Sequence, residues 1–264
     1  MKRQAYPSDL SDLQWDNFEH LLPPPKPGGR PRKYSNRELL DAILYVVRGG
    51  IPWRMLPHDF PPWQAVYGYF RRWQQAGVWQ QVHDALVVTC RACDGREPQP
   101  SAAILDSQSV KTTEQGGPRG YDAGKKVTGR KRHLLVDSLG LLLAVVVHSA
   151  GVQDRDGARR VLAQVRDRLP RLRVIWADGG YAGQLIDWVW RTYGWVLRTV
   201  LRPVGVKGFV LLPRRWVVER TFGWFGRYRR LSKDYERRTD VSETMIYIAM
   251  IHRMSRHLLP EPAI

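Results

Sequence analysis

Residues 133–148 read HLLVDSLGLLLAVVVH, and this stretch carries the clearest fold signal in the chain. Two apolar runs, 133–137 and 141–148, flank Ser138-Leu139-Gly140, which has the composition of a turn. The stretch therefore predicts two antiparallel strands joined by a tight turn. Its second run includes the longest apolar segment of the sequence, which is much shorter than the roughly 18 residues that a membrane-spanning helix needs.

The segments on either side of this hairpin extend the pattern. A third strand is expected over 102–110. After the hairpin, helices are expected over 156–169, 183–193, 214–235 and 242–258, and strands over 172–177 and 195–201. Three antiparallel strands followed by alternating helix and strand predict an α/β domain with a mixed sheet flanked by helices, the element order of an RNase H-like fold.

The first third of the chain has helical signals instead. Capping-box patterns begin at Ser11 and Ser35, and apolar residues follow each of them at helical spacing. Further helices are expected from Pro61-Pro62 to Gly77 and from Val78 to about Cys93. We predict a small all-α, helix-turn-helix-like DNA-binding domain over 1–95, a polar linker over 96–101, and an RNase H-like catalytic domain over 102–264.

The charge of the chain indicates the class of partner. Its 42 Lys and Arg residues against 25 Asp and Glu residues give a formal net charge of +17. Double-stranded DNA is the favoured partner because neutralising phosphates releases counterions, although a ribosomal or merely basic surface also fits. The N-terminus lacks a signal-peptide core and there are only two cysteines, so we expect a cytoplasmic, nucleoid-associated protein.

The two cysteines are Cys90 and Cys93, which form a lone Cys-x2-Cys pair. Without a second pair of Cys or His nearby, this is at most half of a zinc site. Packing of a helix is the favoured interpretation.

Three acids stand out as candidates for phosphodiester chemistry, which commonly uses two divalent cations held by oxygen ligands. Asp106 and Asp178 each follow an apolar strand, and Glu219 lies in a helix lined with Val, Trp and Phe. Ordinary structural roles compete with this hypothesis. A strand-ending Asp often forms a turn, and Glu219 has Arg215 four residues earlier, the spacing of a helical ion pair. Asp137 is better explained by its turn, and Asp154 and Asp156 by capping the next helix.

Basic residues in three regions are candidates for DNA contacts. Around Gly29-Arg30-Pro31 the sequence is typical of arms that enter the minor groove, and a solvated linker is the alternative. Solvent-facing charge is an equal alternative for the pair on the third helix. The candidates in these regions are Arg30, Arg32 and Lys33, then Arg71 and Arg72, then Lys125, Lys126, Arg130 and Lys131.

Four motifs carry a resemblance to a known family. They are ILDSQSVKT (104–112), RGYDAGKKVTGRKRHLLVDSLGLLL (119–143), WADGGYAG (176–183) and RRWVVERTFGWFGRYRRLSKDYE (214–236). Together they resemble the compact DDE transposases of bacterial insertion sequences, in particular insertion-sequence family five. The N-terminal YPSDLSDLQWDNFEHLLP and RGGIPWRMLP are similar to the same group, so the resemblance spans about residues 6–258.

The resemblance implies an RNase H-like catalytic domain in which Asp106, Asp178 and Glu219 hold two Mg²⁺ or Mn²⁺ ions. It implies cleavage at the terminal inverted repeats of the element and joining of the freed 3′-OH to target DNA. No nucleotide cofactor and no membrane are involved, and two ends are paired, so a homodimer on DNA is expected.

One departure from the wider superfamily concerns its Tyr-x2-Arg-x3-Glu-x6-Lys signature. Arg215 fits the Arg position, but Leu212 stands at the Tyr position and Gly226 at the Lys position. Arg215 is itself a candidate for binding DNA phosphate beside Glu219, and Arg227 and Arg230 are the candidates for replacing the missing lysine in that role.

Three functions are consistent with these residues. The first is an active transposase, and the second is a nuclease of the same fold without strand transfer. The third is a transposase-derived DNA-binding repressor, against which the presence of all three acids argues.

Overall fold

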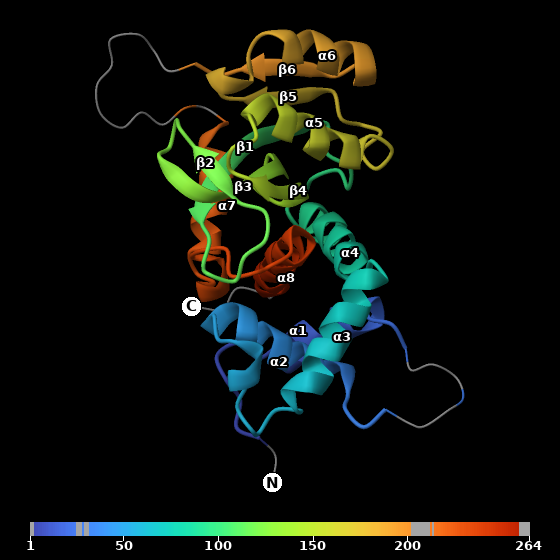
Figure 1. Ribbon diagram of the computed structural model, residues 1–264. Helices are drawn as coiled ribbons and strands as arrows, with labels where there is room; N and C mark the ends of the chain where they lie inside the picture. The colour runs from blue at the N-terminus through green and yellow to red at the C-terminus, as the bar shows by residue number, and fades with distance from the viewer. Residues whose placement is uncertain (1–2, 25–27, 29–31, 202–211, 213, 259–264) are drawn as a thin grey trace. The chain divides into compact units, whose positions relative to one another are not determined.

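The computed structural model describes residues 3–24, 28, 32–201, 212 and 214–258. The chain divides into two compact units. Figure 1 shows the chain coloured by residue number. The helical unit consists of Met1–Asp94, Arg227–Leu231 and Thr244–Ile264, and the sheet unit consists of Gly95–Gly226 and Ser232–Glu243. Within the described residues, no helix combines the length and apolarity that crossing a membrane would require.

The sheet unit contains all the strands of the described chain. Its elements are β1 (Ala102–Lys111), β2 (Gly120–Asp122), β3 (Val127–Asp137), β4 (Leu142–Ser149), α5 (Asp154–Val165), β5 (Val174–Ala177), the 3-10 helix η3 (Gly179–Tyr181), α6 (Gln184–Tyr193), β6 (Val196–Thr199) and α7 (Trp216–Phe225). The strand order is β2-β3-β1-β5-β6, and β4 also pairs with β3. Strands β1, β3 and β4 are antiparallel, whereas β5 and β6 run parallel to β1. The predicted RNase H-like arrangement is confirmed.

The two faces of this sheet carry different helices. Helix α5 packs on β3 and β4, α7 packs on β1 and β3, and α6 lies beside β6 at one edge (Figure 1). Successive side chains of a strand point to opposite faces, so Asp106 and Ser107 of β1 face different helices. Asp106 is near Arg215 at the start of α7, and Ser107 contacts Asp154 at the start of α5. The site is therefore built on the α7 side.

Several element boundaries differ from the sequence prediction. Strand β3 begins at Val127, not at residue 133, and β2 was not predicted at all. Charged residues at 130–132 concealed this strand, because they are buried by partners distant in the sequence. Helix α7 ends at Phe225, not near residue 235, and Gly223 and Gly226 at its end have low helix propensity.

The helical unit begins with the predicted helices. Its elements are α1 (Asp12–Asp16), η1 (Glu19–Leu21), α2 (Asn36–Gly49), η2 (Trp53–Met55), α3 (Trp63–Gln75), α4 (Val78–Cys93), η4 (Arg229–Leu231) and most of α8 (Thr239–His257). Both predicted capping boxes are present, at Ser11 and Ser35. Gly50 ends α2 with φ of 74°, and a Cβ there would lie 2.8 Å from the Arg229 Cβ. Glycine at this position meets both requirements.

Most of α8 packs with the helical unit, although it follows the sheet in sequence. Its residues from Thr244 onwards belong to that unit, whereas a linear boundary assigns all of 102–264 to one domain. The ring centroids of Tyr228 and His252 are 5.7 Å apart, and Cys90 Sγ donates to the Met254 carbonyl at 4.0 Å. The apolar residues of α8 are buried, so this helix completes the core of the helical unit.

Glu243 is the site of a pH-dependent contribution to stability. Its Oε1 accepts a hydrogen bond from the Val147 amide at 2.8 Å, but burial raises its pKa from 4.5 to about 7. Because the folded state disfavours the ionised form, wild-type stability falls as pH rises from about 4.5 to about 7. We expect Glu243→Gln to raise the free energy of unfolding by about 2 kcal/mol at pH 8 and by little at pH 4. Urea denaturation of both proteins at the two pH values measures this difference, and an equal effect at both would contradict it.

Candidate active site

Two of the predicted acids are brought together by strand pairing. Strands β1 and β5 are parallel neighbours, and Ile104 is paired with Trp176. Asp106 and Asp178 each lie two residues beyond this pair. They therefore lie side by side, as the apolar runs that precede them suggested: Asp106 lies within β1, two residues past its last pair with β5, and Asp178 directly follows β5.

Asp106 is the more buried of the two, with 8% of its surface exposed. Its Oδ1 accepts a hydrogen bond from the Ser107 amide at 2.7 Å. Burial raises the pKa of Asp106 to about 6, although this hydrogen bond and Arg215 oppose the shift. Asp178 is half-buried and accepts a hydrogen bond from the Gly180 amide at 2.8 Å, which makes it the N-cap of η3. A buried carboxylate with so few hydrogen-bond donors is held ionised by nearby positive charge.

Among the described residues, the positive charge closest to these acids is the guanidinium of Arg215. Its Nη2 atom lies 3.5 Å from Asp106 Oδ2, 3.9 Å from Asp178 Oδ2 and 3.7 Å from Glu219 Oε1. Glu219 is exposed in the first turn of α7, and Arg215 is the N-cap residue of that helix. The structure thus brings all three predicted acids around one point, although they come from β1, the end of β5, and α7.

The chemistry of this donor set suits a hard divalent cation, because all three groups are carboxylates. The carboxylate oxygens lie 3.5–3.9 Å from the Arg215 nitrogen, whereas Mg²⁺ binds oxygen at about 2.0–2.1 Å. Accordingly, no group of three or more His, Cys, Asp or Glu side chains in the described part of the chain is already spaced to hold a metal ion. The three carboxylates are thus the right chemical groups for a divalent metal ion, and the Arg215 guanidinium lies between them.

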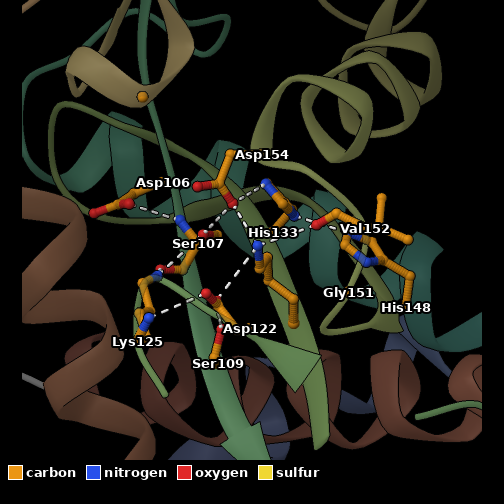
Figure 2. Close-up of polar contacts among 12 residues, drawn as sticks. Asp106, Ser107, Ser109, Asp122, Lys125, His133, His148, Gly151, Val152 and Asp154 are labelled. Atoms are coloured by element: carbon orange, nitrogen blue, oxygen red, sulfur yellow. Dashed lines mark hydrogen bonds and ion pairs between the residues drawn. The ribbon is translucent and has the colours of Figure 1, made fainter. Parts of the chain in front are cut away.

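A polar network lies on the other face of β1 and supports the site from behind (Figure 2). Asp154 is its centre: Ser107 Oγ donates to Asp154 Oδ1 at 3.0 Å, and Lys131 Nζ lies 2.9 Å from the same atom. Lys131 Nζ is also 3.4 Å from Asp122. Although burial alone would raise it, the pKa of Asp154 is lowered, mainly by Lys131. Asp106 is joined to this network through the Ser107 amide.

A pair of histidines closes the network. His133 Nδ1 and His148 Nε2 are 2.9 Å apart, and both residues are buried. Burial lowers the pKa of His133 to about 3 and also lowers that of His148, so both imidazoles are neutral at pH 7. A Cβ on Gly157 would lie 2.2 Å from the His133 ring, so only glycine lets α5 approach the sheet this closely.

The sequence prediction missed this network. Asp154 was interpreted as a cap for the next helix, but the N-cap of α5 is Gln153, and the Asp154 side chain contacts the sheet instead. A signal was present in the sequence. Ser107 and Ser109 on β1, and Lys131 and His133 on β3, are polar residues at alternate positions of buried strands. Such a pattern predicts a shared polar face.

Two predicted DNA contacts are wrong. Arg130 is completely buried and pairs with Asp234 at 3.0 Å, and Lys131 is 4% exposed and pairs with Asp122 and Asp154. The sequence predicted this strand only from residue 133, which left both residues outside it. They lie instead inside β3, which has neighbours on both sides and is therefore buried.

The expected helix over 214–235, which would carry both Glu219 and Arg230, is also wrong. That prediction relied on one continuous helix, but α7 ends at Phe225 and Arg230 lies in η4. Arg230 is buried and donates to the Ile51 carbonyl at 3.0 Å within the helical unit. Arg227 is exposed and belongs to the same unit.

The other predicted DNA contacts have varied surroundings. Lys125 and Lys126 are exposed between β2 and β3, and Lys125 Nζ donates to the Ser107 carbonyl at 2.7 Å. Lys33 and Arg72 are exposed, and the Arg72 guanidinium lies 4.1 Å from the Tyr69 ring centroid. Three further contacts remain. Arg32 donates to the Pro24 carbonyl at 2.9 Å, Arg71 donates to Gln74, and Arg30 lies outside the described residues.

Comparison with known proteins identifies the family. Residues 97–254 match the family described as "Transposase DDE domain", and residues 10–83 match "Putative transposase of IS4/5 family". An uncharacterized 16.2 kDa protein of insertion element IS402 from Burkholderia cepacia is 37% identical over 40% of this chain and 76% of its own length. A protein described as a transposase for IS402 from the same organism is 32% identical over 47% of this chain and 61% of its own length.

A solved structure of the Mos1 strand transfer complex covers 89% of this chain and 79% of the Mos1 chain at 13% identity. The TM-score of this match is 0.31. The family match over 97–254 includes all three acids that surround Arg215. The chain therefore belongs to the DDE transposases, metal-dependent enzymes that cut and join DNA, as its motifs predicted.

Proposed function

We propose that this transposase binds the terminal inverted repeats of its own insertion sequence, cleaves at the element ends, and joins the freed 3′-OH to target DNA. Asp106, Asp178 and Glu219 are the metal ligands in this proposal. The observation that carries it is the position of their three carboxylates around a single nitrogen, from the middle of β1, the end of β5 and the first turn of α7.

The proposed metals are two Mg²⁺ or Mn²⁺ ions, which when bound would activate the attacking oxygen and stabilise the leaving 3′ oxygen. The chain holds its ligands from two sides. Asp106 is fixed by the Ser107 amide, and Ser107 is in turn fixed by Asp154 on the opposite face of β1. A ligand that is oriented by such supporting contacts binds metal with less reorganisation.

Exposed basic residues supply the proposed DNA contacts. Lys125 and Lys126 lie on the sheet unit near Ser107, and Lys33, Arg72 and Arg227 lie on the helical unit. The helical unit would bind the inverted repeat, and the sheet unit would carry the chemistry. Because two element ends must be paired, we propose a homodimer on DNA that acts in the cytoplasm at the nucleoid. Neither step consumes a nucleotide cofactor.

A strand-transfer assay tests the proposal. The substrate is a pre-cut element end with a free 3′-OH, the target is supercoiled DNA, and the assay contains Mg²⁺ or Mn²⁺. Wild type is expected to give joined product, and Asp178→Ala is expected to bind the same end without joining it. A cleavage assay on an uncut end runs in parallel.

Each of the other outcomes would indicate a different function. Cleavage without joining would indicate a nuclease of the same fold. Binding of the end with neither cleavage nor joining, under both metals, would indicate a transposase-derived repressor. Equal joining by wild type and Asp178→Ala would show that Asp178 is not a metal ligand.

A further inference from the structure

The position of Arg215 is not explained by an ordinary helical ion pair. Its spacing from Glu219 is that of such a pair, but the same nitrogen also contacts Asp106 from β1 and Asp178 from the end of β5. One side chain therefore connects three structural elements through a single charged atom. Its guanidinium is a planar cation with several N–H donors, so it can contact several carboxylates at once.

The three carboxylates need a nearby positive charge even when no metal is bound. Their nearest oxygens all lie within 3.9 Å of one atom, and Asp106 is 8% exposed. Without a positive charge at the centre, their mutual repulsion would separate them or force protonation. In the metal-free protein Arg215 supplies that charge.

The contacts of Arg215 are of a kind that can be exchanged. The distances of 3.5–3.9 Å are those of ion pairs rather than of short bidentate hydrogen bonds. Its Nε atom is buried and has no hydrogen-bond partner among the described residues. The guanidinium is therefore held mainly by charge, and a cation of higher charge can compete for the same oxygens.

A divalent ion and the guanidinium cannot occupy this position together. A divalent ion bound by these oxygens would repel the guanidinium, because both are cations and Arg215 Nη2 now lies within 3.9 Å of all three oxygens. We propose that Arg215 is an internal, exchangeable cation, which keeps the three acids together before metal binds and is displaced when metal enters. The displaced guanidinium is then free to pair with a DNA phosphate beside the metal. This inference depends on the proposed metal site.

Metal binding to the DNA-free protein tests the exchange without any reaction. After removal of metal, Mn²⁺ is titrated into each protein and its binding is followed by calorimetry or by electron paramagnetic resonance. Because Arg215→Gln removes the competing cation, we expect it to bind Mn²⁺ about tenfold or more tightly than wild type, within the range of typical coupling between sites. An unchanged or weaker affinity would overturn the proposal.

Arg214→Gln is the matched control. It removes the same charge from the adjacent residue, whose guanidinium lies over the Trp176 ring at 4.1 Å from the centroid and, among the described residues, forms no ion pair with the three acids. We expect its Mn²⁺ affinity to stay within about twofold of wild type, because screened charge at a distance contributes little. If Arg214→Gln tightened binding as much as Arg215→Gln, general charge and not displacement would explain the effect.

Competition between free guanidinium and Mn²⁺ provides a second measurement. Arg215→Ala leaves space for a free guanidinium ion, so millimolar guanidinium is expected to weaken Mn²⁺ binding to this variant more than an equal concentration of NaCl does. In wild type, guanidinium and NaCl at equal concentration should weaken Mn²⁺ binding to the same extent. Circular dichroism checks the fold of each variant, and if Arg215→Ala does not fold, the Arg215→Gln titration decides alone.

Asp178→Ala separates failure of this inference from failure of the metal site. Asp178→Ala is added both to wild type and to Arg215→Gln. If it weakens Mn²⁺ binding in neither protein, the proposed metal site itself is wrong. If Asp178→Ala weakens binding but Arg215→Gln does not tighten it, the site stands and the exchange is wrong.

Discussion

Asp106→Asn is expected to slow both cleavage and joining by about 10³-fold or more, while binding of the element end stays within about threefold. Charge stabilisation by a bound metal contributes several kcal/mol to such reactions, and each 1.36 kcal/mol is worth a factor of ten. The substitution removes the ligand charge but keeps the shape, and the amide oxygen can still accept the Ser107 N–H. Single-turnover assays of both steps, with end binding measured by fluorescence anisotropy, check this expectation.

Asp156→Asn is the control for this substitution. Asp156 is an exposed acid on α5, where it pairs only loosely with Arg159 at 3.5 Å. The same change of charge there should leave both rates within about twofold. If Asp106→Asn retained joining within tenfold of wild type, Asp106 would not be a metal ligand and the proposed site would need a different first acid.

Asp234→Ala is expected to have the largest effect on stability, lowering the free energy of unfolding by about 3–5 kcal/mol. Asp234 and Arg130 form an ion pair at 3.0 Å in which both side chains have no exposed surface. Arg130 also donates to the carbonyls of Pro118, Glu236 and Arg237 at 2.7–2.8 Å. Removing the acid leaves a buried charge without its counterion, which is far less favourable than loss of a surface pair. Urea denaturation measures the change.

Asp240→Ala supplies the comparison, because it removes one acid from a pair that solvent reaches. Arg238 and Asp240 lie 2.9 Å apart, with 65% and 46% of their side chains exposed. Exposed pairs contribute about 0–1 kcal/mol, so we expect a small effect. A loss below about 1 kcal/mol for Asp234→Ala would show that water or rearrangement compensates the Arg130 charge.

The three candidate acids could be located from the sequence because each has a strong local context. Asp106 and Asp178 each follow an apolar run of sequence, where a charge is unfavourable unless other groups compensate it. Glu219 lies in an apolar helix beside Arg215. The parallel pairing of β1 with β5 brings Asp106 and Asp178 together, and the packing of α7 on β1 brings Glu219 to them.

The roles of the basic residues could not be located in this way. Arg130 and Lys131 have the same local sequence character as Lys125 and Lys126, yet the first two are buried and the last two are exposed. The difference depends on the length of β3 and on Asp234, which is 104 residues from Arg130. Local composition contains no information about such a partner.

The sequence by itself determined the helices with capping boxes, the hairpin of β3 and β4, the strand-ending acids and the family. These features depend on residues within a few positions of one another, whose backbone preferences and periodicity act locally. Only the tertiary structure decided which charges are buried, that α8 packs mainly with the N-terminal helices, and that Arg215 stands between the three acids. Those outcomes depend on the desolvation of charge by distant segments, which is decided when the sheet and its helices pack together.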